Sequence, residues 1–342
     1  MNPKVNVLMI TYNQEQYIGQ AIESVLAQRV NFTYELVIGE DCSTDGTREI
    51  CRTYHERYPE KIRLLRRGKN LGMMPNFFQT LAECKGEYIA ILEGDDYWTD
   101  PYKLQKQIDF MVSDTDCTLV FHSVEVLSGV DSQLMSAHNY DSSGLYIKKN
   151  TPDQYIKKED IIMHSGSFIS TPSIMFRADI LSELPHWLLN ALIGDYPLTL
   201  LAVAKGNAYF INEVMAAYRL GVPGSAVSRN KDLAFEDKFK IYKNVVSTLN
   251  GFNEYTNRRF ENAVKERISD TLYYFLVSYS YVDRRRRLNA YNLFKKNLKY
   301  AHRKEIWLGL FPCFKPIFAL FSLLKKNAWR LLGYLKSSNG IL

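Results

Sequence analysis

The sequence lacks the cysteine patterns that indicate a disulfide framework or a zinc site. Its five cysteines are scattered over 342 residues and form no CxxC pair and no zinc-ligand spacing. An odd, scattered set of cysteines is typical of free thiols in a reducing compartment. The first residues, Met1-Asn2-Pro3-Lys4, do not resemble a signal peptide. We therefore expect a cytoplasmic protein.

Common nucleotide-binding motifs are also missing. No GxGxxG follows the first apolar run, and no GxxxxGK[ST] occurs anywhere, which argues against dinucleotide-binding and P-loop sites. The segment that starts at Asp41 imitates a calcium loop, with Ser43, Asp45 and Gly46 at suitable positions. Its twelfth position is Arg52, however, where a calcium loop requires a bidentate Glu. The calcium-loop interpretation therefore fails.

Composition and charge divide the chain into an acidic body and a basic tail. With 46% apolar and 23% charged residues, the composition is that of a folded protein, and the length allows two to three structural units. The net charge is +6, yet residues 283–342 hold 14 Lys and Arg against 2 Asp and Glu. The rest of the chain is therefore net acidic, and the two parts are expected to meet different partners.

Strand-like apolar runs alternate with helical periodicity in the first half of the chain. This alternation predicts an α/β fold, with a mostly parallel sheet and helices on both faces. Residues 128–160 are polar and lack a clear period, so we expect a long loop there. The predicted strands are 5–10, 34–38, 62–65, 88–92, 118–123, 173–176 and 209–211, and the predicted helices are 17–26, about 50–54, 76–83, 103–112 and 196–204.

After residue 225 the pattern becomes wholly helical. The predicted helices are about 232–249, 256–281 and 285–303. We therefore divide the chain into a first domain at 1–225, a helical region at 226–303 and a tail at 304–342.

A cluster of carboxylates follows the buried strand 88–92. Glu93, Asp95 and Asp96 stand within four residues and repel one another, so a positive group is expected among them. A hard divalent cation with oxygen ligands is the natural candidate. The alternative is an acidic turn that caps the next helix. Thr99-Asp100-Pro101 already supplies a cap and a proline for that helix, so these carboxylates are not needed for capping.

Four polar turns follow four successive predicted strands, at residues 11–15, 40–47, 68–72 and 93–96. In a parallel sheet the carboxyl ends of the strands lie at one edge, where ligands bind. We therefore expect these turns to form one ligand site.

The residues of these turns match a known pattern in order and spacing. The motifs are Thr11-Tyr12-Asn13, Glu40-Asp41-Cys42-Ser43-Thr44-Asp45-Gly46-Thr47, Asn70-Leu71-Gly72 and Glu93-Gly94-Asp95-Asp96. Together they resemble the family 2 glycosyltransferases of GT-A fold, over roughly residues 4–220 and most strongly over 4–112. The resemblance implies a nucleotide-sugar donor above the turns, a D-x-D aspartate that meets a metal on the diphosphate, and a later aspartate that acts as the base.

The resemblance implies a role for each matching residue. Asp41 corresponds to the carboxylate that accepts a hydrogen bond from the base ring, and Asp95 to the metal ligand. Glu93 would join Asp95 in holding Mg²⁺ or Mn²⁺. Glu93 and Glu40 stand where the family commonly has Asp, which lengthens each arm but keeps its charge. The remaining implied nucleotide contacts are Thr11, Tyr12, Asn13, Glu15, Asn70 and Asp96.

The implied general base is Asp195, in the segment Gly194-Asp195-Tyr196. Glycine replaces the first of the family's two acidic residues here, and the alternative is that Asp195 only caps a helix. As a base, Asp195 would take a proton from an acceptor hydroxyl, and attack from the opposite face would invert the anomeric centre. Relatives often carry a histidine after a Tyr-Arg near the end of the domain. Leu220-Gly221 follows Tyr218-Arg219 here, so no second metal ligand is assigned.

The tail combines apolar and basic character. Residues 306–324 are almost wholly apolar, but Pro312 and Pro316 argue against one uninterrupted spanning helix. Basic residues flank the run, and Trp307 and Trp329 are of the type that prefers membrane interfaces. We expect a peripheral anchor at the inner face of the cell membrane. The alternative is a helical pair packed on the catalytic domain or on a dimer partner, so a homodimer stays open.

These observations predict an inverting, metal-dependent glycosyltransferase. It would move a sugar from a nucleotide donor, expected to be a UDP-sugar, to a glycan or lipid-linked acceptor in cell-surface polysaccharide synthesis. Two alternatives remain, a catalytically silent sugar-nucleotide or glycan-binding scaffold and a sugar-phosphate nucleotidyltransferase of similar fold. No nucleic-acid partner is expected, because the run Arg284–Arg287 lacks interleaved stacking residues.

Overall fold

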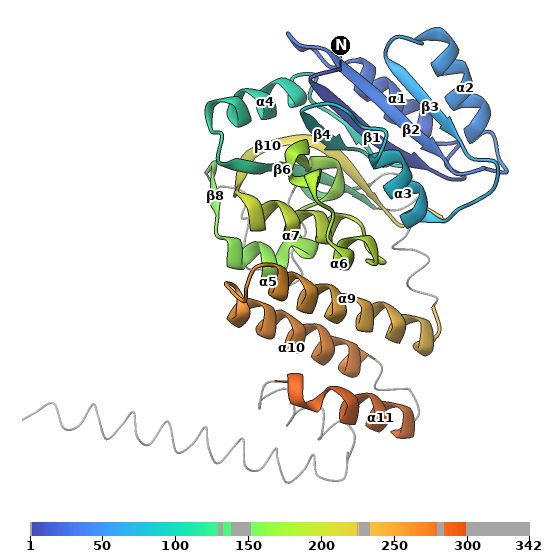
Figure 1. The fold of residues 1–342 in the computed structure, drawn as a ribbon. Helices are drawn as coiled ribbons and strands as arrows, with labels where there is room; N and C mark the ends of the chain where they lie inside the picture. Colours follow the sequence, from blue (N-terminus) through green and yellow to red (C-terminus); the bar gives the residue numbers. More distant parts are fainter. Residues whose placement is uncertain are drawn as a thin grey trace, which may run out of the picture. The chain divides into compact units, whose positions relative to one another are not determined.

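The computed structural model describes residues 2–128, 133–137, 152–223, 225, 233–278 and 284–298. It divides into two compact units, Met1–Val264 and Lys265–Leu342. Within the described residues, the first unit holds a ten-stranded sheet with helices on both faces (Figure 1). The expected α/β class is confirmed.

The first half of the sheet is a parallel set of four strands, in the order β3-β2-β1-β4. Side chains of β1 alternate between the faces, so Val7 and Met9 join one buried cluster and Leu8 joins the other. Because these strands are parallel, their carboxyl ends lie at the same edge. The strands are β1 (Val5–Thr11), β2 (Tyr34–Glu40), β3 (Ile62–Arg66) and β4 (Tyr88–Ile91).

Seven helices pack on the two faces of the sheet in the described part of this unit. Helices α1, α2 and α4 contribute to the cluster that contains Val7, whereas α3, α5, α6 and α7 contribute to the cluster that contains Leu8. Their bounds are α1 (Ile18–Leu26), α2 (Thr47–Arg57), α3 (Met73–Leu81), α4 (Lys103–Ser113), α5 (Lys158–Phe168), α6 (His186–Leu189) and α7 (Asp195–Lys205).

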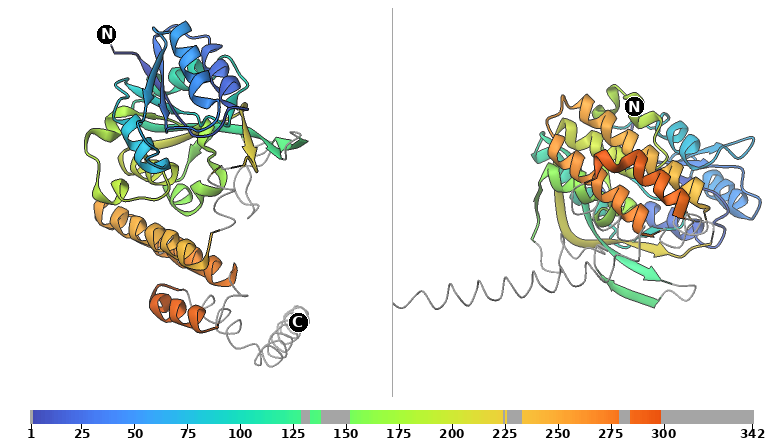
Figure 2. Two further views of the ribbon diagram at one scale, coloured as in Figure 1. Left: turned by 90° about the vertical axis from the view of Figure 1, so that its right-hand side faces the viewer. Right: turned by 90° about the horizontal axis from the view of Figure 1, so that it is seen from below.

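The second half of the sheet is mixed. β9 runs antiparallel to both β4 and β6, while the long strands β6 and β10 pair in parallel along their length (Figure 2). The short strands β5 and β8 add to β10 in antiparallel fashion, and β7 adds to β6. These strands are β5 (Tyr97–Trp98), β6 (Cys117–Ser128), β7 (Gln133–Ala137), β8 (Gln154–Ile156), β9 (Met175–Arg177) and β10 (Asn207–Leu220).

Several elements differ from the sequence-based expectation. β10 extends to Leu220, although only 209–211 was expected as a strand, because the polar pair Asn212-Glu213 interrupts the apolar pattern at a register shift. The expected loop 128–160 contains β7, β8 and the start of α5 among its described residues. The three residues of β8 are exposed or half-buried, so this strand gives little apolar signal.

Helix α9 (Phe235–Tyr255) also runs further than the predicted end at 249. Gly251 lies inside it, where α9 packs against α6 (Figure 1). A Cβ atom at position 251 would lie 2.4 Å from Cβ of Trp187. The glycine therefore allows the two helices to approach closely.

Substitution of Gly251 with Ala tests this close approach. In a helix the change normally stabilises by about 0.8–1 kcal/mol, whereas overpacking a well-packed site costs about 1–3 kcal/mol. We expect the clash with Trp187 to dominate, so that Gly251→Ala lowers the free energy of unfolding in urea titration. Gly19→Ala in α1 is the control, because its nearest new neighbour lies 3.9 Å away. It should stabilise the protein, and stabilisation by both variants would contradict the packing argument.

The remaining described α-helices are α10 (Glu261–Ser278) and α11 (Arg284–Phe294). They correspond to the predicted helices 256–281 and 285–303. Three short 3-10 helices complete the described helical segments, at Thr171–Ser173, Ala178–Ser182 and Lys295–Asn297. In the part of the chain that the structure describes, no helix combines the length and the apolar character needed to cross a bilayer. The predicted membrane-associating tail, 304–342, lies outside the described residues, and the domain boundary near 225 stays a prediction.

Candidate active site

The four polar turns surround one cavity of about 160 Å³ at the carboxyl edge of the parallel strands. The cavity is lined from every turn, and Tyr218 and Arg219 of β10 complete its wall. The expected convergence of the turns is therefore present in the structure. The predicted site residues that line the cavity are Thr11, Tyr12, Asp41, Asn70, Glu93 and Asp95.

The first turn is held against the second by polar side chains. Asn13 has a positive φ of 53°, and its side-chain oxygen accepts a hydrogen bond from the backbone N–H of Thr44 at 2.8 Å. The Glu15 carboxylate accepts a hydrogen bond from the Gly46 N–H at 2.7 Å. Asn13 and Glu15 line neither described cavity. Their contacts position the turns, and the nucleotide contacts expected for both stay a prediction.

The second turn places Asp41 at the floor of the cavity. Asp41 is 3% exposed, and its two carboxylate oxygens accept the backbone N–H groups of Leu71 and Gly72 at 2.8 and 2.9 Å. The side chain of Asn70 donates to the Asp41 carbonyl at 3.1 Å. A carboxylate offers about four acceptor positions, so Asp41 keeps capacity for a ligand N–H. The third turn is thereby fixed to the second.

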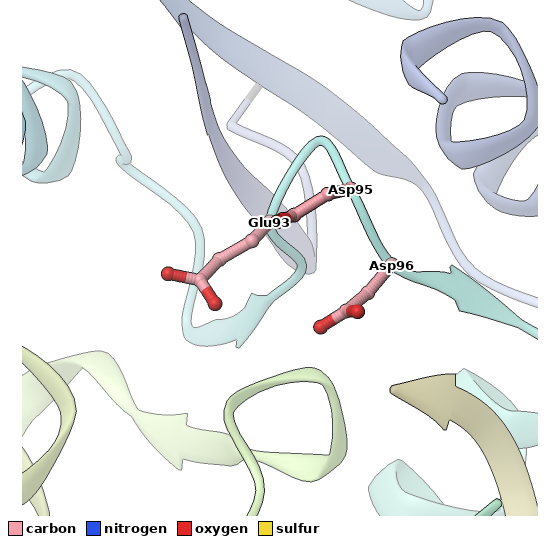
Figure 3. Close-up of side chains that lie close together, drawn as sticks. All are labelled: Glu93, Asp95 and Asp96. Carbon is pink, nitrogen blue, oxygen red and sulfur yellow. The ribbon is translucent and has the colours of Figure 1, made fainter. Parts of the chain in front are cut away.

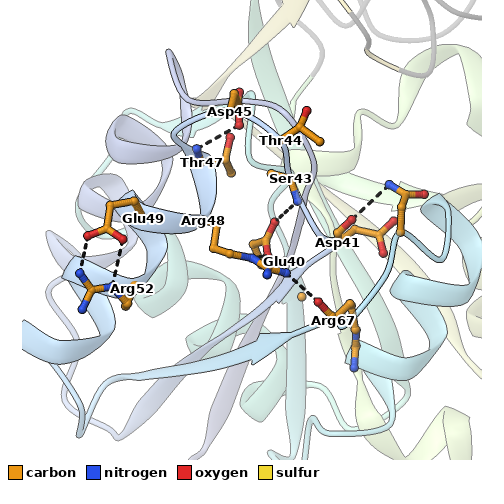
Figure 4. Close-up of polar contacts among 12 residues, drawn as sticks. Glu40, Asp41, Ser43, Thr44, Asp45, Thr47, Arg48, Glu49, Arg52 and Arg67 are labelled. Carbon is orange, nitrogen blue, oxygen red and sulfur yellow. Dashed lines mark hydrogen bonds and ion pairs between the residues drawn. The ribbon is translucent and has the colours of Figure 1, made fainter.

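Glu40, which replaces the more common Asp, points away from this cavity into an ion pair. Its carboxylate is fully buried, and it accepts the Nε–H of Arg48 at 2.6 Å and the backbone N–H of Ser43 at 2.6 Å (Figure 4). Arg48 in turn donates to the Arg67 carbonyl at 2.6 Å. The longer Glu side chain therefore supports the turn from behind.

The acidic turn follows β4 and brings three carboxylates together. One oxygen each from Glu93, Asp95 and Asp96 lies within 4.8 Å of the others (Figure 3). Gly94 stands between Glu93 and the two aspartates, and a Cβ atom at position 94 would lie 2.9 Å from Oγ1 of Thr11. The glycine lets the first turn approach the acidic turn closely.

Arg219 supplies part of the positive charge that the sequence required near this turn. Its backbone N–H donates to Oδ1 of the fully buried Asp96 at 2.8 Å, and its guanidinium donates to the Asp95 carbonyl at 2.6 Å. The guanidinium carbon lies 5.1 and 4.7 Å from the ring centroids of Tyr17 and Tyr97. Asp96 lines neither described cavity. The hydrogen bond that it accepts from the Arg219 N–H connects the acidic turn to β10.

Burial raises the pKa of all three carboxyl groups, and repulsion by neighbouring carboxylates adds to this effect at Glu93 and Asp96. Removal from water, and then Asp95 and Asp195, raise the pKa of Glu93 to about 8. Burial also raises the pKa of Asp95, although Arg219 partly opposes this effect. For Asp96, burial and the two neighbouring carboxylates raise the pKa well above its usual range. The surroundings therefore do not balance the negative charge of this turn, which favours a bound cation.

A divalent cation fits the donor set of the acidic turn. All candidate ligand atoms are carboxylate oxygens, the type that Mg²⁺ and Mn²⁺ prefer. In addition, Oδ2 of Asp96 is buried without a hydrogen-bond partner. Glu93 and Asp95 face the first cavity, so a cation held by them would also reach a substrate oxygen there.

Asp195 lies at the start of α7 and lines a second cavity of about 500 Å³. Its Oδ2 accepts a hydrogen bond from Oγ1 of Thr171 at 3.3 Å, and its Oδ1 accepts the Tyr196 N–H at 2.8 Å. Burial raises the pKa of the Asp195 carboxyl group. Glu93 and Tyr218 line both cavities, so the second cavity adjoins the first.

A match to a known family identifies the kind of fold that carries this site. The family described as Glycosyl transferase family 2 matches residues 6–184, more than half of the chain. The chain belongs to glycosyltransferase family 2. The expected family is confirmed, and the GT-A fold is confirmed with it.

Relatives of this family 2 chain include bacterial glycosyltransferases. The putative teichuronic acid biosynthesis glycosyltransferase TuaG of Bacillus subtilis is 30% identical over 246 residues, which cover 71% of this chain and 88% of TuaG. The uncharacterized protein Rv1520 of Mycobacterium tuberculosis is 33% identical over 217 residues, which cover 63% of this chain. The match spans only 58% of that mycobacterial protein.

Solved structures resemble this chain in fold. Residues 1–349 of Staphylococcus aureus TarS, crystallised with UDP, align with a TM-score of 0.54 and 16% identity, over 90% of this chain and 86% of the TarS chain. The same TarS segment with UDP-GlcNAc gives a TM-score of 0.53 and 18% identity, over 82% of each chain.

Sequence reasoning missed several residues of this family 2 site. Arg219 lies 124 positions from Asp95, and nothing in the local pattern links the two. Tyr218 and Met73 border both cavities, and Gln14 accepts the Thr11 hydroxyl at 2.8 Å. Two signals were available, the need for a positive group near the acidic turn and the likeness of Tyr218-Arg219 to the Tyr-Arg of relatives, but neither placed Arg219 against Asp95.

Proposed function

We propose that this family 2 chain is an inverting glycosyltransferase. It would move a sugar from a nucleoside diphosphate donor, taken here as a UDP-sugar, to a hydroxyl group of a glycan or lipid-linked acceptor. The observation that carries the proposal is the continuity of the two cavities, because Glu93 lines both, Asp41 and Asp95 line the first, and Asp195 lines the second. The UDP and UDP-GlcNAc complexes of TarS support the donor class, and the name of TuaG supports polysaccharide synthesis.

The first cavity suits the nucleotide part of the donor. Asp41 can accept a ring N–H, such as that of uracil, with the acceptor positions that Leu71 and Gly72 leave free. Tyr12 lines the same cavity and is 37% exposed, so its ring offers a face for the base or ribose. The diphosphate would then lie toward Asp95 and Glu93.

The transfer step uses Asp195 as the base. The acceptor oxygen attacks the anomeric carbon and forms the new C–O bond, while the bond between that carbon and the diphosphate oxygen breaks. The Asp195 carboxylate takes the hydroxyl proton, and the bonding electron pair leaves with the nucleoside diphosphate. Attack opposite the leaving group inverts the anomeric centre. Thr171 donates a hydrogen bond to one Asp195 oxygen and so orients the carboxylate.

Glu93 and Asp95 would hold Mg²⁺ or Mn²⁺ against the donor diphosphate. Such a cation, when bound, stabilises the charge that builds up on the leaving group. Asp96 supports the turn through the Arg219 N–H at 2.8 Å. Arg219 keeps the turn in place through its bond to the Asp95 carbonyl.

The place of action proposed is the cytoplasmic face of the membrane. Residues 304–342 combine an apolar run with flanking basic side chains, which supports peripheral attachment to anionic lipids. A lipid-linked acceptor would be accessible from that position.

Donor binding can be tested by thermal unfolding of the full chain. UDP with Mn²⁺ is expected to raise Tm, because a ligand at one hundred times its Kd adds about 2.7 kcal/mol to the stability of the folded state. Mn²⁺ alone and GDP with Mn²⁺ are the controls for metal and base. If no nucleoside diphosphate raises Tm, the donor proposal is wrong. Release of UDP from a UDP-sugar without acceptor would separate an enzyme from a silent binding scaffold.

A further inference from the structure

We infer that the second cavity binds a hydrocarbon group of the acceptor, so that the reacting hydroxyl belongs to an amphiphile such as a sugar with an alkyl or prenyl aglycone. The inference rests on the proposed function, since it assigns the cavity around Asp195 to the acceptor. The glycosyl transfer itself is unchanged. What is added is the chemical class of the group beside the hydroxyl.

The two adjoining cavities differ sharply in character. Of the sixteen residues that line the second cavity, eleven are Leu, Ile, Met or Phe, against two of the fourteen that line the first. The apolar walls come from β1, α3, β4, the segment before α7, and α9 with the residue Leu233 before it. Met74, Phe77, Leu192 and Ile241 are among them. A cavity of about 500 Å³ lies within the usual size range of small-molecule sites, about 300–1,000 Å³.

The polar groups of the second cavity form one connected set. Thr171 donates to Asp195, and Glu93 lines the same cavity as these two residues. Glu93 and Tyr218 belong to both cavities, so this polar set adjoins the donor cavity. An acceptor hydroxyl at Asp195 would therefore face the donor, and the rest of the acceptor would extend along apolar walls.

The lining of this cavity disfavours two other kinds of acceptor group, anionic groups and bare oligosaccharides. Among its described lining residues there is no Lys, Arg or His, whereas Glu93 and Asp195 are acidic. A phosphate or carboxylate placed there would meet repulsion and no counter-charge. A bare oligosaccharide would leave hydroxyl groups against aliphatic side chains without hydrogen-bond partners, which is unfavourable. A hydrocarbon group loses nothing in these surroundings and gains from its removal from water.

Alkyl glucosides of increasing chain length provide the probe. Methyl, hexyl and octyl β-D-glucoside, below their micelle concentrations, are titrated into the full chain in the presence of UDP and Mn²⁺, and binding is measured by calorimetry. We expect affinity to rise by up to about fourfold for each methylene group that the cavity buries. Equal affinity for the methyl and octyl compounds would overturn the inference.

A matched pair of variants locates the binding. Leu192 lines the cavity and is 46% exposed, so Leu192→Glu places a charge at its wall without burying it. Leu184 lies nearby in sequence, is 39% exposed and is absent from the lining, so Leu184→Glu is the control. We expect Leu192→Glu to weaken octyl glucoside binding by at least about tenfold and Leu184→Glu to leave it unchanged. Equal effects of the two variants, or no effect of either, would overturn the inference.

The UDP measurement separates this inference from the proposed function. Both variants should bind UDP with Mn²⁺ as the wild type does, because neither residue lines the first cavity. If the wild-type chain binds UDP but its affinity for alkyl glucosides does not depend on their chain length, then only the hydrocarbon site is contradicted. If the wild-type chain does not bind UDP in the presence of Mn²⁺, then the proposed UDP-sugar glycosyltransferase function is contradicted.

Discussion

Replacing Asp195 with Asn is expected to lower kcat by about 10²–10⁴-fold, the contribution typical of a positioned general base. The amide has nearly the shape of the carboxylate, and its oxygen can still accept one of the two hydrogen bonds that Thr171 and Tyr196 donate. The start of α7 should therefore stay in place. What is lost is the ability to take the proton from the acceptor hydroxyl.

The measurement compares turnover and donor affinity in the same preparation. Asp195→Asn should bind UDP with Mn²⁺ as tightly as the wild type, because Asp195 does not line the first cavity. Asp179→Asn is the control, since its side chain is 66% exposed and forms a surface ion pair with Arg177. Turnover by Asp195→Asn at the wild-type rate would remove this residue from the mechanism.

The sequence was most informative where local patterns and burial agree. β1, β2 and β4 are apolar runs buried on both faces, and the turns after them carry polar residues that the strands do not need. Parallel pairing then places those turns at one edge, which is why Asp41 and Asp95 could be expected at one cavity before any coordinates were known.

The features that could not be predicted depend on contacts between distant segments. Arg219 reaches the acidic turn because β10 is longer than its apolar pattern suggests and because β5 pairs with it. The apolar cavity exists because α3, α9, the segment before α7 and residues of β1 and β4 come together without filling the space between them. Side-chain periodicity reports which face of each element is buried, but it does not report such a gap.

The site is also where the chain departs from ordinary local preferences. Asn13 and Cys42 adopt positive φ values of 53° and 61°, and three carboxylates lie in a turn with little access to water. Such departures cost stability and cluster at functional sites. The burial of the Asp96 carboxylate has a structural reason, because this carboxylate accepts the backbone N–H of Arg219 and so fixes the end of β10.

Replacing Asp95 with Asn is expected to have the second large effect on activity, and it tests whether the acidic turn holds a divalent cation. A metal that stabilises the leaving group supplies several kcal/mol, so its loss should reduce the rate by about 10²–10⁴-fold. The increase in Tm caused by UDP with Mn²⁺ should disappear as well. In contrast, the metal-free variant should unfold at the wild-type temperature or above it, because one of three mutually repelling carboxylates has been neutralised.

A metal ligand and a structural residue can be told apart by these two measurements. Replacing a metal ligand lowers the metal-dependent activity but not the stability of the metal-free protein, whereas replacing a structural residue lowers both. Asp109→Asn on the exposed face of α4 is the control, and it should change neither quantity. With the wild-type chain, EDTA should abolish transfer and added Mn²⁺ should restore it. If transfer continues in EDTA, or if Mn²⁺ stimulates Asp95→Asn as strongly as the wild type, then the acidic turn serves some purpose other than holding a cation.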